Sequence, residues 1–138
     1  MIKTQSERNY MMKITVTAGI IQYQGKILIA QRKSTKSLGG YWEFPGGKIE
    51  DGETCSDCLA REIKEEFDIS INVGDFLMET EHTYDFGNLK MYVYRALWDG
   101  KGSIRICDHD DYKWVTLEEM KNYQFAPADI PVVEKICA

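Results

Sequence analysis

Residues 47–69 read GKIEDGETCSDCLAREIKEEFDI, a turn-forming segment followed by a stretch rich in carboxylates. Three of these, Glu62, Glu65 and Glu66, are spaced i, i+3 and i+4, so on an α-helix they lie on one face, within roughly 100° of arc. The apolar residues of the adjoining stripe are Leu59, Ala60, Ile63 and Phe67. The pattern therefore predicts a helix that packs one stripe inward and presents three carboxylates beside it.

The expected helix carries signals at both ends. Thr54 is a good N-cap, and Asp57 stands three residues later at the position of a capping box, which places the helix at residues 55–67. Asp68 follows it, and Asp tolerates the left-handed conformation better than most residues do, so we expect the helix to end there.

The loop before the helix favours a metal site. Two glycine-containing segments, residues 45–47 and 51–53, allow the loop to fold back, so that backbone carbonyls and Glu53 can approach the carboxylate face. Like charges at this spacing repel each other, and a divalent cation removes that penalty. Mg²⁺ and Mn²⁺ prefer carboxylate oxygens. The alternative, a solvated acidic face, is the usual one for a Glu-rich helix.

This register resembles the Nudix box, in which Gly is followed after five residues by Glu and after seven more by R-E-U-x-E-E-x-G-U, where U is aliphatic. The matching residues are Gly47, Glu53, Arg61, Glu62, Ile63, Glu65, Glu66 and Ile69. Asp68 departs from the box, because it stands at the late glycine. Residues 42–48, 108–115 and 125–131 resemble further segments of the MutT-like enzymes, so the resemblance covers nearly the whole chain from Met12.

The resemblance implies a nucleoside triphosphate pyrophosphohydrolase that uses Mg²⁺, with Mn²⁺ as a substitute. In the family, water attacks a bridging phosphorus, which releases a nucleoside monophosphate and pyrophosphate. The implied metal ligands are Gly46 (through its carbonyl), Glu62, Glu65, Glu66 and the distant Asp108. The implied catalytic residues are Glu53, Arg61, Glu62, Glu65 and Glu66. The general base stays open between one of these Glu residues and a residue on a mobile loop.

Arg61 is expected to orient carboxylates, for instance by pairing with Glu53. The alternative for Arg61 is a surface salt bridge with Asp57 or Glu65, which contributes only a few tenths of a kcal/mol, roughly, to stability.

Four residues are candidates for substrate binding. Arg32 and Lys48 are expected to contact phosphate, against the alternative of plain solvated side chains. Phe44 either packs in the core, which is slightly favoured, or touches the base. Asp129 either caps the last helix or hydrogen-bonds to a base edge, and an ionised Asp accepts only, which suits the amino groups of cytosine or guanine.

The context of Asp129 bears on the substrate. In MutT-like enzymes an Asn at this place accompanies selectivity for 8-oxo-guanine, whereas relatives with Asp in a P-A-D-I-P context include CTP pyrophosphohydrolases. The resemblance therefore implies action on (d)CTP, on oxidised nucleotides such as 8-oxo-dGTP, or on both. The alternatives are a hydrolase of nucleotide sugars or dinucleotides, and a non-catalytic nucleotide-binding module. Such modules often lack box carboxylates, and all are present here.

Composition agrees with one folded domain. The chain has 138 residues, 43% of them hydrophobic and 28% charged, which is ordinary for a globular protein. We expect a polar N-terminal extension at residues 1–11 and one domain at 12–138. The net charge of −5 argues against a nucleic-acid polymer as partner. Because no apolar run approaches a membrane span and no secretory signal is evident, we expect a cytoplasmic protein. The sequence leaves open whether it is a monomer or a homodimer.

The four cysteines include a C-x-x-C pair, Cys55 and Cys58. Such a pair can bind zinc or act in redox chemistry, but the remaining cysteines and histidines have no motif spacing. We expect reduced thiols instead, with Cys58 packed beside the acidic face and Cys55 exposed in the first helical turn.

The rest of the chain predicts an α/β fold. Strands are expected at residues 14–23, 26–31, 72–84, 90–99 and 112–115, with a short strand before residue 44. Turns are expected at Gln24-Gly25 and at residues 85–88, where Gly87-Asn88 is a good turn dipeptide. Thr116, with Glu119 at the capping-box position, should begin another helix, and a last helix should follow Asp129. This mixture predicts a mixed sheet with helices on both faces, and the resemblance implies the Nudix α/β/α sandwich.

Overall fold

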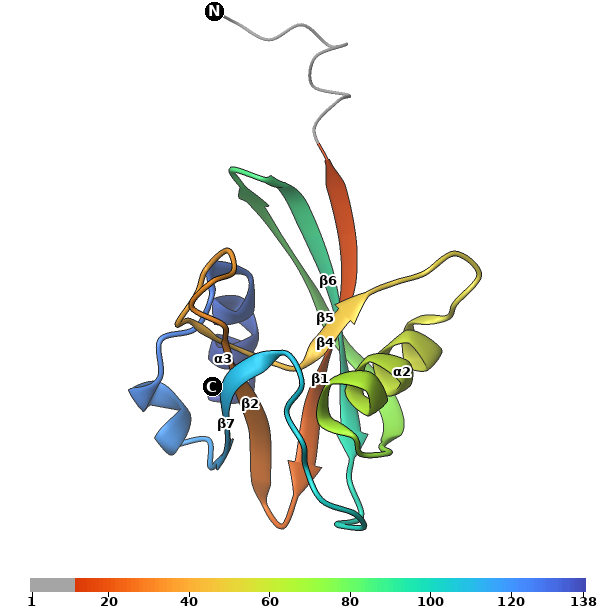
Figure 1. Cartoon of the computed structure of the whole chain (residues 1–138). Helices are drawn as coiled ribbons and strands as arrows, with labels where there is room; N and C mark the ends of the chain where they lie inside the picture. Colours follow the sequence, from red (N-terminus) through yellow and green to blue (C-terminus); the bar gives the residue numbers. More distant parts are fainter. Residues whose placement is uncertain (1–11) are drawn as a thin grey trace, which may run out of the picture.

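The computed structural model describes residues 12–138, and the predicted N-terminal extension at 1–11 lies outside the described residues (Figure 1). The prediction of one domain at 12–138 stays a prediction. No helix in the described part of the chain is long and apolar enough to cross a membrane.

A seven-stranded sheet forms the centre of the fold. Its main path runs in the order β3-β2-β1-β6-β5, while β4 pairs with β1 and β7 pairs with β2. The strands are β1 (Lys13–Tyr23), β2 (Lys26–Arg32), β3 (Trp42–Glu43), β4 (Gly46–Lys48), β5 (Asn72–Tyr84), β6 (Gly87–Leu97) and β7 (His109–Val115). The pair β1–β6 is parallel and the others are antiparallel, which confirms the predicted mixed sheet.

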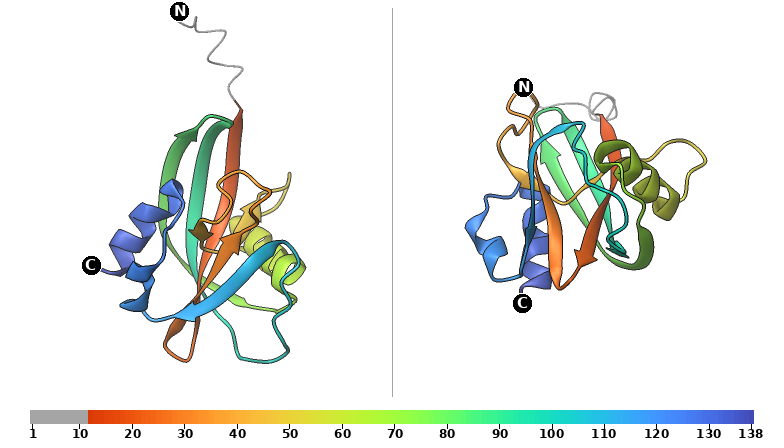
Figure 2. Two further views of the ribbon diagram at one scale, coloured as in Figure 1. Left: turned by 60° about the vertical axis from the view of Figure 1, so that its left-hand side comes forward. Right: turned by 60° about the horizontal axis from the view of Figure 1, so that its bottom comes forward.

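Helices cover both faces of this sheet, as predicted. Helix α2 (Cys55–Phe67) lies on one face and helix α3 (Ile130–Ile136) on the other (Figure 2). Successive residues of a strand point to opposite faces, and the two cores divide accordingly. Ile20 belongs to the core that contains Val132 of α3, whereas Ile21 belongs to the core that contains Leu59 of α2.

The ends of α2 are formed as the sequence predicts. The Thr54 hydroxyl accepts a hydrogen bond from the Asp57 amide at 3.1 Å. Asp68 ends the helix with φ 57° and ψ 33°, the left-handed conformation, and its amide donates to the Lys64 carbonyl. Cys58 is fully buried and Cys55 is half-buried. The prediction for Cys58 is therefore confirmed, whereas Cys55 is less exposed than expected.

The last helix follows Asp129 as predicted, but the helix expected after Thr116 differs from the structure. Thr116 and Glu119 do form a reciprocal capping box, with bonds of 3.0 and 3.1 Å, but they begin only the 3₁₀ turn η1 (Glu119–Asn122) rather than an α-helix. The chain must extend soon afterwards, because Phe125 bridges to Trp42. Asp129 precedes α3, but its side chain makes no capping hydrogen bond.

The two hairpin turns differ in outcome. Gln24 and Gly25 form the β1–β2 turn with φ values of 49° and 76°, as expected from the sequence. The β5–β6 turn consists of residues 85 and 86, with Tyr84 paired to Gly87. The turn thus lies within the predicted residues 85–88, but Gly87 and Asn88 already belong to β6. Gly87, at φ 144°, lies against Met12, where a Cβ would collide with the backbone.

Candidate active site

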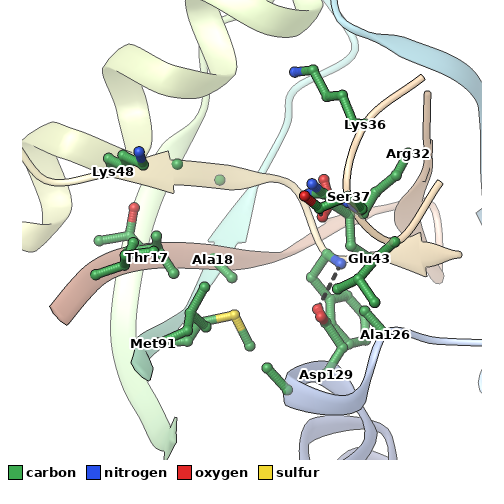
Figure 3. Close-up of a pocket in the computed structure, with 18 of the residues that line it drawn as sticks. Thr17, Ala18, Arg32, Lys36, Ser37, Glu43, Lys48, Met91, Ala126 and Asp129 are labelled. Atoms are coloured by element: carbon green, nitrogen blue, oxygen red, sulfur yellow. Dashed lines mark hydrogen bonds and ion pairs between the residues drawn. The ribbon is translucent and has the colours of Figure 1, made fainter. Parts of the chain in front are cut away.

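A cleft of about 580 Å³ runs from the acidic face of α2 to the segment before α3. Glu62 and Glu66 line one end, and Asp129 lines the other. Strand β4 and the loop after β2 form facing walls, so that Lys48 lies across the cleft from Arg32 and Lys36 (Figure 3). The sequence-predicted residues outside the lining are Glu53, Arg61 and Glu65.

The two glycines of β4 allow this strand to lie against both the sheet and α2. Gly46 pairs with Ala18 of β1, and a Cβ at Gly46 would collide with the backbone carbonyl of Thr17. A Cβ at Gly47 would instead collide with the carboxyl group of Glu62. Gly46 is therefore required by sheet pairing, and Gly47 makes room for a carboxylate.

Arg61 organises the carboxylates behind the cleft. Its Nε and Nη2 donate to the two carboxylate oxygens of Glu53 at 2.6 and 2.9 Å, a bidentate pair. Its Nη1 donates to Glu62 at 2.9 Å and to Glu65 at 3.2 Å. The Arg61 hydrogen bond lowers the pKa of Glu53 to about 2, so Glu53 is ionised at neutral pH. The expected pairing of Arg61 with Glu53 is thus present.

The three box carboxylates differ in environment. Glu62 is largely buried, with 14% of its side chain exposed, whereas Glu65 is 58% exposed and lies outside the cleft lining. Glu66 has one buried carboxylate oxygen, Oε2, without a hydrogen-bond partner among residues 12–138. Burial, followed by the charges of Glu62, Glu43 and Asp108, raises the pKa of Glu66 to about 8.

This donor set fits a hard divalent cation. Within the described residues no three carboxylate, imidazole or thiol side chains already converge as metal ligands. Arg61 donates hydrogen bonds to both Glu62 and Glu65. The unpartnered oxygen of Glu66, beside other carboxylates, is the type of atom that Mg²⁺ binds. Burial disfavours the ionised form of Glu66, and a bound cation would neutralise the charge of that carboxylate.

Asp108 lies at the mouth of the cleft. Its carboxylate pairs with the Lys36 ammonium and lies 4.0 Å from that of Lys33. The hydrogen bond from Lys36 lowers the pKa of Asp108. The structure thus places Asp108 near the acidic face, as the sequence predicts, but with two lysines that the sequence analysis did not single out.

At the far end of the cleft, Asp129 is buried, with 5% of the residue exposed. Its Oδ1 accepts a hydrogen bond from the Phe44 amide at 3.0 Å, so the carboxyl group joins α3 to the strand segment before β4 (Figure 3). Burial and then the charge of Glu43 raise the pKa of Asp129 well above its ordinary value. A neutral carboxyl group both donates and accepts hydrogen bonds, unlike a carboxylate.

The other predicted contact residues also line the cleft. Phe44 is only 3% exposed and stacks on Phe125 at 5.2 Å, so it is a core residue that also borders the cavity. Lys48 is exposed on β4. Arg32 is half-buried and already bonded, with Nη1 at 2.9 Å from Glu43 and Nε at 2.8 Å from the Ser37 carbonyl.

Besides Lys36, sequence reasoning missed three polar residues of this cleft that hydrogen-bond within it: Glu43, Tyr84 and His109. Glu43 bonds to both Arg32 and His109, and Tyr84 accepts a hydrogen bond from the Ala128 amide at 2.9 Å. Glu43 and His109 both stand in the segments that resemble MutT-like enzymes, which is the signal that could have identified them. Tyr84 had no such signal, because it ends an ordinary edge strand.

Comparison with known proteins gives consistent results. A family model described as NUDIX domain matches residues 16–135. A CTP pyrophosphohydrolase of Escherichia coli is 35% identical over 93% of this chain and 94% of its own length. An 8-oxo-dGTP diphosphatase of Proteus vulgaris is 34% identical over 68% of this chain and 90% of its own. A solution structure of the Nudix hydrolase MutT from methicillin-resistant Staphylococcus aureus 252 is 42% identical, with a TM-score of 0.74, and covers 92% of this chain and 97% of that one.

Proposed function

The chain belongs to the Nudix family and is a MutT-like nucleoside triphosphate pyrophosphohydrolase, and we propose that it acts with Mg²⁺ on (d)CTP and on oxidised nucleotides such as 8-oxo-dGTP. One observation carries this proposal: a single cleft joins the acidic face of α2 to the buried carboxyl group of Asp129. The first end suits charged phosphates with their cation, and the second suits a base.

At the acidic end, we assign cation binding to Glu62, Glu65, Glu66 and the Gly46 carbonyl, with Asp108 at the mouth. Bound Mg²⁺ supplies charge neutralisation for the phosphates and an activated water at neutral pH. Mn²⁺ can substitute, since it prefers the same oxygen ligands. Arg61, held by Glu53, keeps Glu62 in place beside Gly47.

Lys48 and Arg32 approach the cleft from facing walls and supply positive charge to the phosphates (Figure 3). With water as nucleophile, the bond between two phosphoryl groups breaks, and the products are a nucleoside monophosphate and pyrophosphate. The chain's own contribution is to hold the phosphates in the orientation for attack.

At the other end, the base would lie against Phe44 and near Asp129. A neutral Asp129 carboxyl group can donate to a ring nitrogen of cytosine and accept from its amino group. Its Oδ1 is fixed by the Phe44 amide, so the free oxygen is oriented. The same pair of functions suits an oxidised purine, which also presents neighbouring donor and acceptor atoms. The names of the two relatives, a CTP pyrophosphohydrolase and an 8-oxo-dGTP diphosphatase, support both substrates.

The test is a substrate panel with Mg²⁺ and then Mn²⁺: CTP, dCTP, 5-methyl-dCTP, dGTP and 8-oxo-dGTP, with ADP-ribose and diadenosine tetraphosphate added. The measured quantity is kcat/KM for the release of pyrophosphate or of the corresponding products. We expect dCTP and 8-oxo-dGTP to exceed dGTP. Preference for ADP-ribose or the dinucleotide would overturn the substrate assignment, and binding of dCTP without turnover of any compound would indicate a binding module.

A further inference from the structure

Three side chains from three strands form a chain of hydrogen bonds along the cleft wall. His109 Nε2 lies 2.9 Å from Glu43 Oε2, and Arg32 Nη1 donates to Glu43 Oε1 at 2.9 Å. The side chains become more exposed along this chain, from 4% at His109 to 19% at Glu43 and 27% at Arg32. Two hydrogen bonds thus connect the buried His109 imidazole, through Glu43, to the Arg32 guanidinium, which lines the cavity.

A β-bulge brings His109 opposite Arg32. In the β2–β7 ladder Gln31 pairs with Asp111, but the next pair is Arg32 with His109, so Asp110 is the extra residue. A shift of one residue moves a side chain to the other face of a sheet. The bulge therefore turns His109 toward the α2 face, where its ring stacks on Phe67 at 5.2 Å.

The protonation states along this chain are fixed by charge. Burial alone would raise the pKa of Glu43, but the hydrogen bond from His109 and the charge of Arg32 outweigh it, and the pKa is lowered. An ionised carboxylate only accepts hydrogen bonds, so His109 Nε2 carries the proton and donates. His109 Nδ1 has no partner within residues 12–138, so the bond to Glu43 is the polar contact that the imidazole makes there.

Arg32 is consequently held at two of its nitrogens. Nη1 is bound by Glu43 and Nε by the Ser37 carbonyl at 2.8 Å. Nη2 makes no hydrogen bond to another residue in the described part of the chain, and Arg32 lines the cleft. A guanidinium fixed on two sides presents its remaining N–H groups in one direction, which lowers the entropy lost when they bind a phosphate.

We propose that His109 is a positioning residue: it fixes Glu43, and Glu43 fixes Arg32 in the orientation that binds a substrate phosphate. This inference rests on the proposed function, because it requires a phosphorylated substrate in the cleft. His109 touches no substrate in this role. A purely structural histidine would need only its stacking on Phe67, whereas the positioning role also needs its Nε2–H.

The test uses variants that separate two contributions of His109: the stacking of its ring on Phe67 and the hydrogen bond that its Nε2–H donates. His109→Phe keeps an aromatic ring over Phe67 but removes the N–H, and His109→Gln restores an N–H donor without the ring. Arg32→Ala removes the guanidinium that Glu43 holds. His82→Phe is the matched control, at a histidine outside the cleft lining. Each variant, and the double variant of Arg32→Ala with His109→Phe, is measured for kcat and KM with dCTP and Mg²⁺. The Kd of a non-hydrolysable α,β-methylene dCTP and the Tm are measured on the same samples.

We expect His109→Phe to raise KM and Kd about tenfold with kcat changed less than about threefold, a loss near 1.4 kcal/mol in binding. His109→Gln should recover most of this loss, and the double variant should bind no worse than Arg32→Ala alone. Unchanged binding in His109→Phe, or additive losses in the double variant, would overturn the proposal. Failure of the proposed function itself looks different, because the wild-type protein would then neither turn over nor bind the dCTP analogue.

Discussion

The two ends of the cleft both use carboxyl groups, in opposite ways. On α2, Glu62 and Glu66 lie among other carboxylates, and one oxygen of Glu66 has no hydrogen-bond partner among residues 12–138. At the other end, Asp129 is buried, accepts a hydrogen bond from the Phe44 amide, and feels the charges of Glu43 and Arg32. We propose that a cation completes the acidic end, whereas at the end proposed for the base the raised pKa of Asp129 favours the protonated carboxyl group. The environment, and not the residue type, decides which chemistry each carboxyl group can perform.

The largest effect on kcat is expected from a substitution at the acidic end of the cleft, Glu66→Gln. Glu66→Gln keeps the shape of the side chain but removes the negative charge assigned to cation binding. We expect kcat for dCTP to fall by roughly a hundredfold or more, as when one electrostatic contact to a transition state is removed. Steady-state kinetics over a range of Mg²⁺ concentrations measures this loss. The control is Glu134→Gln on the exposed part of α3, and equal activity in the two variants would refute the assignment.

The glycines of β4 distinguish sheet pairing from the site. Gly46→Ala places a methyl group against the Thr17 carbonyl, which is backbone, so we expect a loss of about 2–3 kcal/mol in the free energy of unfolding. Gly47→Ala meets only the carboxyl end of Glu62, which can move. That variant should stay within about 1 kcal/mol of the wild type. Its kcat should nevertheless fall about tenfold, because Glu62 is displaced.

Urea unfolding and kinetics on the same two samples check this prediction. If Gly47→Ala destabilised the fold as much as Gly46→Ala, Gly47 would be needed for folding and not only to leave room for the Glu62 carboxyl group.

The base end is tested by pH. The folded pKa of Asp129 is raised well above its ordinary value, so the folded state holds this proton more tightly than the unfolded chain does. The resulting stability is fully present below the unfolded pKa of about 3.9 and is lost as pH rises through the folded pKa. Asp129→Asn cannot ionise. Relative to the wild type, its free energy of unfolding should therefore rise between pH 5 and pH 9.

Urea unfolding at both pH values measures that difference, with Glu134→Gln again as the control. A mutant-to-wild-type difference that does not change with pH would mean that Asp129 is ionised in the folded protein. Asp129 could then only accept hydrogen bonds from the substrate base.

The same comparison explains what the sequence could predict. The acidic end is local: three Glu residues on one helix, a cap at Thr54 and a glycine loop are all defined by spacings of a few residues. The base end is assembled from distant segments, since Phe44 and Asp129 are 85 residues apart. A resemblance to known segments indicated these residues, but only the structure shows that Asp129 is buried, that its pKa is raised and that its side chain does not cap α3.

Glu43 and His109 mark the limit of sequence reasoning here. They are 66 residues apart, and their contact depends on a one-residue bulge between Gln31 and Arg32. Without the bulge, strand alternation would place His109 on the other face of the sheet. The same kind of long-range contact shortened the helix expected after Thr116, because the chain turns to pair Phe125 with Trp42. Local pattern carries no information about either event.

The smallest expected effect concerns Asp68, the one residue at which the chain departs from the Nudix box. Its φ of 57° is left-handed, a conformation that is strained for residues with a Cβ and free for glycine. Asp68→Gly also removes an exposed pair with Lys64 at 3.2 Å, which contributes little. We therefore expect Asp68→Gly to stabilise the fold by about 0.5 kcal/mol and Asp68→Ala to destabilise it by about 1 kcal/mol.

Thermal unfolding of these two variants measures the difference, and kcat should be unchanged in both, since Asp68 lies outside the cleft lining. A fall in kcat for Asp68→Gly at unchanged Tm would show that the end of α2 helps to place Glu66, two residues earlier. In that case the departure from the box would belong to the acidic end of the cleft and not merely to the helix cap.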